Sequence, residues 1–155
     1  MNASYIFRGA VPALLVAAAL ALAGCETTSS MWDSTKSLFG GGSKVTLNGA
    51  QEVPPVKTSA SGSGTITVGS DKSVSGSVTT SGVNGTAAHI HLGAEGKNGP
   101  VAVPLAKGAD GNTWSVPAGA KLTDAQYDAY KAGNLYVNVH SAANKGGEIR
   151  GQIKP

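Results

Sequence analysis

From residue 44 onward, apolar and polar residues alternate in short runs. Successive side chains of a β-strand point to opposite faces, so this alternation predicts strands with one buried face. The runs are bounded by Gly, Pro, Asn, Asp or Ser, which favour turns. The predicted strands lie within KVTLNGA, GTITVG, SVSGSVTT, AAHIHLG, VAVPLA, NTWSV, LYVNVHS and GEIRGQI. About eight short strands in roughly 110 residues predict an all-β antiparallel sandwich or barrel.

One segment departs from this alternation. Residues 122–133 read LTDAQYDAYKAG. Thr123 is suited to cap a helix, and Gln126 stands three residues later, where it completes a capping box. Gly133 is a suitable residue to end the helix. We therefore expect one short helix that connects two strands.

Composition changes this picture little. The chain has 155 residues, of which 22 are Gly, and this length suits one domain better than two. Its formal net charge is +3, and the lysines are scattered rather than clustered. A nucleic-acid-binding protein usually carries a concentrated basic patch, so we expect no nucleic-acid partner.

The first segment has the layout of a secretory signal. Arg8 precedes an apolar stretch over Ala10–Ala23, which is short for a bilayer span. The sequence LAGC that ends at Cys25 resembles the bacterial lipoprotein processing box, in which cleavage precedes the cysteine and its thiol receives lipid. This resemblance implies a signal peptide over residues 1–24. Glu26 follows the cysteine instead of Asp, which by the same resemblance favours the outer membrane.

Residues 25–43 then comprise the lipidated Cys25 and a polar, flexible tether that ends in GGGS. Cys25 is the only cysteine, so the chain cannot form an internal disulfide. Lipid on this residue would hold the protein on a membrane of the cell envelope without a transmembrane helix. The folded domain is expected to span residues 44–155.

All three histidines of the chain fall on one predicted face. His89 and His91 are two residues apart on one strand and therefore share a face. His140 lies on the face of its strand opposite the aliphatic residues. If the last two strands form a hairpin, three residue pairs face each other on this outer face: His140 with Glu148, Asn138 with Arg150, and Tyr136 with Gln152.

Neutral imidazole is a good ligand for copper and for zinc. Three imidazole nitrogens with one open position suit either ion. Beyond Gly40 the chain has no Cys and no Met, which excludes a blue-copper site in the domain. The candidate metal ligands are therefore His89, His91 and His140, with Glu148 as the first candidate for a fourth and Glu95 as the second. The alternative is that these are ordinary surface histidines of a sheet.

Three segments resemble, in order, the motifs of the CHRD domain: LNGAQEVPPV (47–56), AAHIHLGAEGKNGPVAVPL (87–105) and GNLYVNVHSAANKGGEIRGQI (133–153). This family is named for chordin and is common in bacterial secreted proteins. The resemblance implies an antiparallel Greek-key-like β-sandwich, similar to immunoglobulin-like or superoxide dismutase-like folds. It implies no single activity. In chordin, these domains are extracellular modules of a protein that binds growth factors.

Within these motifs, Gly93, Gly96 and Gly99 are suited to a loop that needs positive φ. The segment GAQEVPPV resembles an edge strand that leaves the sheet at Pro54-Pro55, with Glu52 expected to be solvated.

Three functions remain open. The first is a lipid-anchored envelope module that holds a copper or zinc ion on its histidines. The second is a metal-free structural or adhesion module that binds an envelope protein or a glycan. The third is a superoxide dismutase-like enzyme, because HIHxG resembles the copper strand of copper–zinc superoxide dismutase. Three histidines are too few for that enzyme's binuclear centre. The chain also has no G-x-S-x-G elbow and no phosphate-binding loop, so we expect no catalysis.

Overall fold

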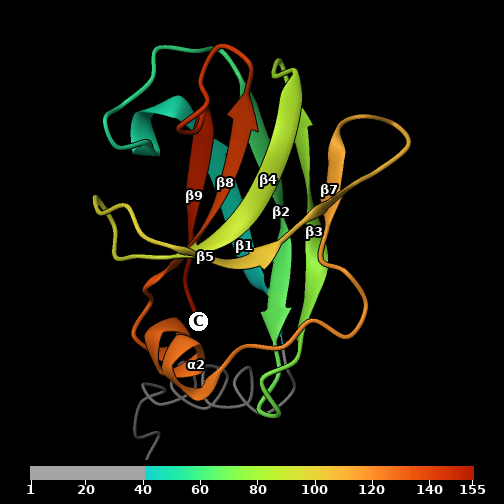
Figure 1. Cartoon of the computed structure of the whole chain (residues 1–155), viewed down its shortest axis with the longest axis vertical. Coiled ribbons are helices and arrows are strands. Elements are labelled where there is room, and N and C mark those ends of the chain that lie inside the picture. Colours follow the sequence, from blue (N-terminus) through green and yellow to red (C-terminus); the bar gives the residue numbers. More distant parts are fainter. Residues whose placement is uncertain (1–40) are drawn as a thin grey trace, which may run out of the picture.

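The structure, a computed structural model, describes residues 41–155 (Figure 1). The predicted signal peptide (residues 1–24), the lipidated Cys25 and all but the last residues of the predicted tether (25–43) lie outside the described residues. None of the helices in the described part of the chain is both long enough and apolar enough to span a membrane.

The described residues form nine strands, one 3-10 helix and one α-helix. The strands are β1 (Ser43–Asn48), β2 (Ser61–Val68), β3 (Val74–Ser81), β4 (Gly85–Leu92), β5 (Val101–Pro104), β6 (Ala106–Lys107), β7 (Thr113–Ser115), β8 (Leu135–Ser141) and β9 (Ile149–Ile153). The helices are η1 (Gly49–Gln51) and α2 (Asp124–Lys131). Each segment in which the alternation predicts a strand overlaps at least one observed strand.

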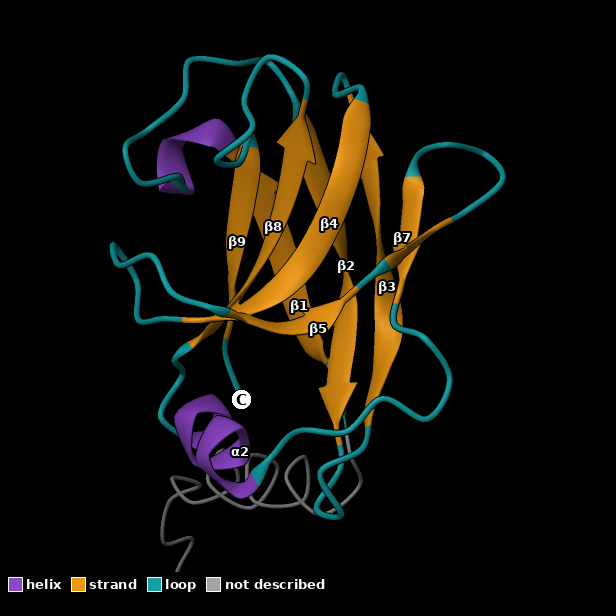
Figure 2. Ribbon diagram, viewed as in Figure 1, coloured by secondary structure: helices purple, strands orange, loops and turns teal. Residues whose placement is uncertain are grey.

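All strand pairs are antiparallel, and the strands follow the order β5-β4-β8-β9-β1-β2-β3-β7-β6. The sheet curls into a nearly closed, barrel-like β-sandwich (Figure 2). Its two outermost strands, β5 and β6, are consecutive in the chain and are separated only by Leu105. The backbone N–H of Leu105 donates to the carbonyl oxygen of Ala88 on β4 at 2.9 Å. The predicted all-β antiparallel sandwich is confirmed.

The interior of the barrel takes the aliphatic residues of the alternating pattern. The fully buried core side chains include Leu47, Ile66, Ile90, Val137 and Ile149. They come from β1, β2, β4, β8 and β9, so the core joins strands that are far apart in the sequence. Burial of each such side chain stabilises the fold by roughly 1.5–3 kcal/mol.

The predicted connecting helix is confirmed as α2, which lies at one end of the barrel (Figure 1). The backbone N–H of Gln126 donates to the hydroxyl of Thr123 at 3.3 Å. The backbone N–H of Thr123 donates in turn to the side-chain oxygen of Gln126 at 2.8 Å. These two bonds form the capping box. Gly133, with φ of 71°, follows the end of the helix.

The prediction for GAQEVPPV is wrong. Residues 49–56 form no strand, because β1 ends at Asn48 and η1 follows it directly, and β1 itself lies between β9 and β2 in the sheet. The chain leaves it through η1, because the side chain of Asn48 accepts a hydrogen bond from the backbone N–H of Gln51. This turn carries Glu52 back over the sheet, where only 4% of the residue is exposed.

The prediction of positive φ is correct only for Gly96, whose φ is 75°. The other two glycines are needed for space. A Cβ on Gly99 would overlap the carbonyl oxygen of Leu92, and a Cβ on Gly93 would lie 2.9 Å from the ring of Tyr136.

Candidate metal centre

The three histidines come from two neighbouring strands. His89 and His91 lie on β4 and His140 lies on β8, and the register of this pair sets Ala87 opposite His140 and His91 opposite Tyr136. Each histidine offers one nitrogen, and the three nitrogens lie within 4.8 Å of one another. A copper or zinc ion with nitrogen bonds of about 2.0 Å needs its ligand nitrogens roughly 3.3 Å apart. Small side-chain rotations would therefore close the group around one ion.

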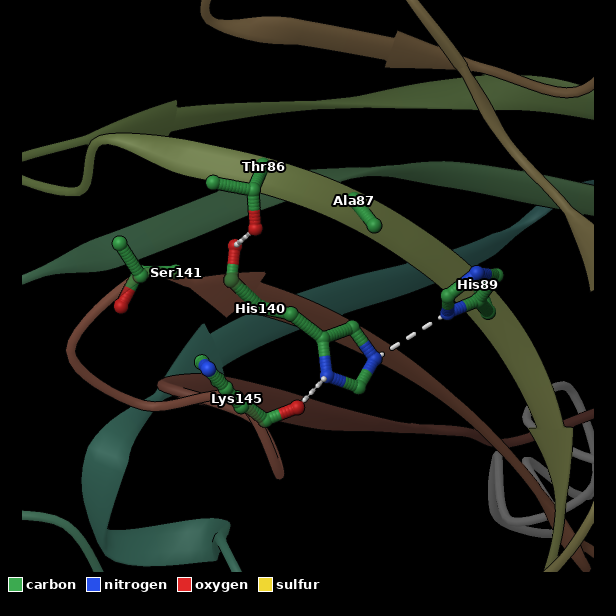
Figure 3. Close-up of a pocket in the computed structure, with 7 residues that line it drawn as sticks. Thr86, Ala87, His89, His140, Ser141 and Lys145 are labelled. Carbon is green, nitrogen blue, oxygen red and sulfur yellow. Dashed lines mark hydrogen bonds between the residues drawn. The ribbon is translucent and has the colours of Figure 1, made fainter.

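The tautomer of His140 follows from its partners (Figure 3). Its Nδ1 lies 2.9 Å from the carbonyl oxygen of Lys145, which can only accept, so Nδ1 carries the proton. The Nε2 of His140 is then the nitrogen that can accept a hydrogen bond. It lies 3.1 Å from Nδ1 of His89, which donates to it. An ion at this position would replace the proton shared by the two rings.

His91 presents the clearest sign of a ligand. Its Nδ1 donates to the carbonyl oxygen of Gly99 at 3.0 Å, which leaves the lone pair on Nε2. That Nε2 is buried and has no hydrogen-bond partner. Buried polar atoms nearly always have partners, and an unpartnered one often marks an ion or water site. Histidine ligands of metals typically donate their second nitrogen to a carbonyl, as His91 and His140 do here.

The electrostatics favour neutral rings. Burial is the main cause of the lowered pKa of His89, and repulsion from His140 and His91 lowers it further. Burial also lowers the pKa of His91, and this effect exceeds the opposing one of the hydrogen bond to Gly99. Neutral imidazole is the form that binds metal, so protons compete weakly for these two rings.

Beyond His140, which is partly exposed, the outer face of β8 and β9 is not open to solvent, contrary to the expectation from the alternating pattern. The assumed register is confirmed, because Tyr136 pairs with Gln152 and Asn138 pairs with Arg150. All four residues are nevertheless buried. Two loops cover them, and Asn98 of one loop donates to the carbonyl oxygen of Val53 of the other at 2.8 Å.

The covering loop between β4 and β5 supports His91. The ring of Tyr136 stacks on the imidazole of His91 with 5.0 Å between centroids and an interplanar angle of 7°. The guanidinium carbon of Arg150 lies 3.5 Å from the centroid of the Tyr136 ring. The Tyr136 hydroxyl accepts from the backbone N–H of Gly99 at 3.2 Å, and Arg150 donates to the carbonyl oxygen of Ala94 at 2.9 Å. These contacts hold the carbonyl of Gly99 where it fixes the tautomer of His91.

The structure does not bring either predicted carboxylate into the group. The carboxylate of Glu148 accepts a hydrogen bond from the hydroxyl of Thr58 at 2.9 Å. A hydrogen bond from Ser141 is the main cause of the lowered pKa of Glu148. Glu95 is exposed and its carboxylate lies 3.9 Å from the ammonium group of Lys154. Within residues 41–155, the cluster that can hold a metal comprises the three histidines.

A hollow of about 530 Å³ adjoins the cluster (Figure 3). His89 and His140 line it, and His91 does not. The rest of its lining is Thr86, Ala87, Ser141, Ala142 and Lys145.

Sequence reasoning missed the carbonyl oxygens of Gly99 and Lys145, which orient the imidazoles. Backbone carbonyls are present at every residue, so no sequence signal distinguishes these two.

The chain was compared with known proteins. The family model of the CHRD domain matches residues 43–153. Neither the curated proteins nor the solved structures contain a match to the chain.

Proposed function

Because this chain belongs to the CHRD domain family, a β-fold binding module, we propose that its histidine cluster is the binding site and that it holds one copper or zinc ion. The proposed activity is reversible binding for storage, delivery or sensing, without catalysis. Residues 41–155 contain no Cys and no Met, and three imidazole nitrogens without a sulfur ligand favour copper(II) or zinc.

The observation that carries this proposal is the buried, unpartnered Nε2 of His91 beside the hydrogen-bonded pair of His89 and His140. Leaving a polar atom buried without a partner costs roughly 1–3 kcal/mol. A bound ion would recover that cost. An ordinary surface histidine would instead direct its free nitrogen to solvent.

Calorimetric titration of residues 26–155 with copper(II) and zinc tests the proposal. This fragment contains every described residue, and it must be purified without a histidine tag. We expect one ion per chain, and no binding by the variant with His89, His91 and His140 changed to Ala. Each single His→Ala variant should bind more weakly by about 100-fold or more, because it loses a ligand, and loss of a residue that merely orients a ligand already costs about 10–100-fold.

Thr86→Ala is the matched control. Thr86 lines the same hollow, and its hydroxyl lies 3.3 Å from the backbone carbonyl oxygen of His140, but it offers no ligand nitrogen. It should bind the ion as the parent does. Equal binding by the parent and the triple variant would refute the metal site. The search would then turn to a metal-free adhesion role with an envelope protein or glycan as partner.

We also propose that lipid on Cys25 anchors this module to the outer membrane of the cell envelope. The supporting observation is the order of Arg8, the apolar stretch and LAGC at the start of the chain. The mass of the full-length product should show lipid on Cys25 and loss of residues 1–24. Cys25→Ser should move the protein to the soluble fraction. An unmodified cysteine in a membrane-bound product would contradict this anchor.

A further inference from the structure

The charge at the proposed centre is left uncompensated by the protein. Three neutral imidazoles bring no negative charge to a divalent ion, so the full 2+ charge remains. Within the described residues, the cluster contains no carboxylate, and Glu148 is bonded to Thr58 instead. A divalent charge beside the buried His91 interacts more strongly with a counter-ion than it would in water.

The access route to the centre is one-sided. His91 approaches from the buried side, against Tyr136, and does not line the hollow. His89 and His140 do line it, so the remaining coordination position of an ion would face this space of about 530 Å³. The adjoining side chains of Ala87, Ser141 and Ala142 are small.

The charged residue that lines the hollow is positive, which favours an anion. Apart from the two histidines, the ionisable residue of its lining is Lys145, and no acidic residue lines it. An anion in this space would meet the ion at one end and an ammonium-bearing residue at the rim.

We infer that the fourth ligand of this centre is a small monovalent anion, of carboxylate size, which enters through the hollow beside Ala142. The inference rests on the proposed metal site. It makes the centre a binding site for two components, an ion held by the protein and an exchangeable anion held by the ion.

The test uses the full chain loaded with one equivalent of copper(II), with azide and formate as probes. Titration is followed by the azide-to-copper absorption band and by the copper electron paramagnetic resonance spectrum. We expect saturable 1:1 binding of azide, displacement of azide by formate, and retention of the nitrogen splittings of the three histidines.

A pair of neighbouring variants tests the route. Ala142 and Ala143 are both exposed residues of the turn after β8, but only Ala142 lines the hollow. Ala142→Phe should weaken azide binding by at least about tenfold and leave copper affinity unchanged, because the ring occupies the hollow. Ala143→Phe should match the parent in both measurements.

The outcomes separate the two proposals. A chain that binds no copper overturns both the metal site and the anion site. A chain that binds copper, but whose spectra do not change with azide or formate, overturns the anion site alone. Azide binding that is equal in the two Phe variants overturns entry through the hollow.

Discussion

Glu52→Gln should remove a pH dependence of stability that a buried carboxyl group imposes on this domain. Glu52 is 4% exposed, and its Oε2 accepts a hydrogen bond from Nδ2 of Asn138 at 3.1 Å. Its Oε1 and the Oδ1 of Asn138 are buried without partners. Burial raises the pKa of Glu52 from 4.5 to about 7, although Asn138 and Arg150 act in the opposite direction.

The sign and size of the pH dependence of stability follow from this pKa. A carboxyl group with a raised pKa binds its proton more tightly in the folded state than in the unfolded state. Its contribution to stability is therefore fully present below the unfolded pKa of 4.5 and is lost as pH rises through about 7. With pKa values of 4.5 in the unfolded state and about 7 in the folded state, the free energy of unfolding should fall by about 2.5 kcal/mol from pH 5 to pH 8.

Glutamine has nearly the same shape and does not ionise. Its amide N–H can also donate to Oδ1 of Asn138, which the ionised carboxylate cannot do. Urea unfolding of the metal-free parent and of Glu52→Gln at pH 5 and pH 8 measures the effect. From pH 5 to pH 8, the free energy of unfolding of the variant should rise by about 2.5 kcal/mol relative to that of the parent. The titration of His89 and His91 is common to both proteins and cancels in the comparison.

Glu95→Gln serves as the matched control, because it removes an exposed carboxylate on a nearby loop. Its stability should stay parallel to that of the parent across the pH range. If the free energies of unfolding of Glu52→Gln and the parent also ran parallel from pH 5 to pH 8, Glu52 would not be a buried carboxyl group with a raised pKa. The reasoning from its burial would then be refuted.

Two further predictions address the metal centre and the helix. The pKa values of His89 and His91 are lowered, so zinc binding should persist to a lower pH than at an ordinary imidazole site. Zinc titrations between pH 5 and 7.5 would measure this. A zinc affinity that has already fallen by half above pH 6.5 would contradict the prediction. Thr123→Ala should cost about 1 kcal/mol in urea unfolding, because it removes the N-cap of α2, whereas Thr123→Ser should retain most of that stability. Equal losses in both variants would argue against the cap.

Local patterns were sufficient to predict these elements: alternation predicted the strands and the shared face of the histidines, and the capping residues Thr123 and Gln126 predicted the helix. The register assumed for the last hairpin, with Asn138 opposite Arg150, is also the one observed. These features depend on local patterns, because side chains two residues apart on a strand share a face. The convergence of His89, His91 and His140 follows once β4 and β8 pair.

The parts that sequence reasoning could not supply depend on contacts between distant segments. Alternation places Arg150 opposite the core, but it does not show that a loop some fifty residues away covers that side. The hydrogen-bond partner of Glu148 could not be predicted for a similar reason, since Thr58 lies in a loop before β2. Glu52 precedes two prolines and has the pattern of an exposed loop residue, although a turn at Asn48 carries it under cover.

The closure of the sheet at Leu105 has a consequence for crowded surfaces. A strand at the end of a sheet offers unpaired backbone groups to other copies of the chain, which leads to aggregation. Here the terminal strands β5 and β6 have only four and two residues, and β5 ends in Pro104, which has no N–H to donate. Copies of the domain brought close together would therefore find little backbone on which to pair. The short terminal strands therefore limit edge-to-edge pairing without covering the histidine cluster on β4 and β8.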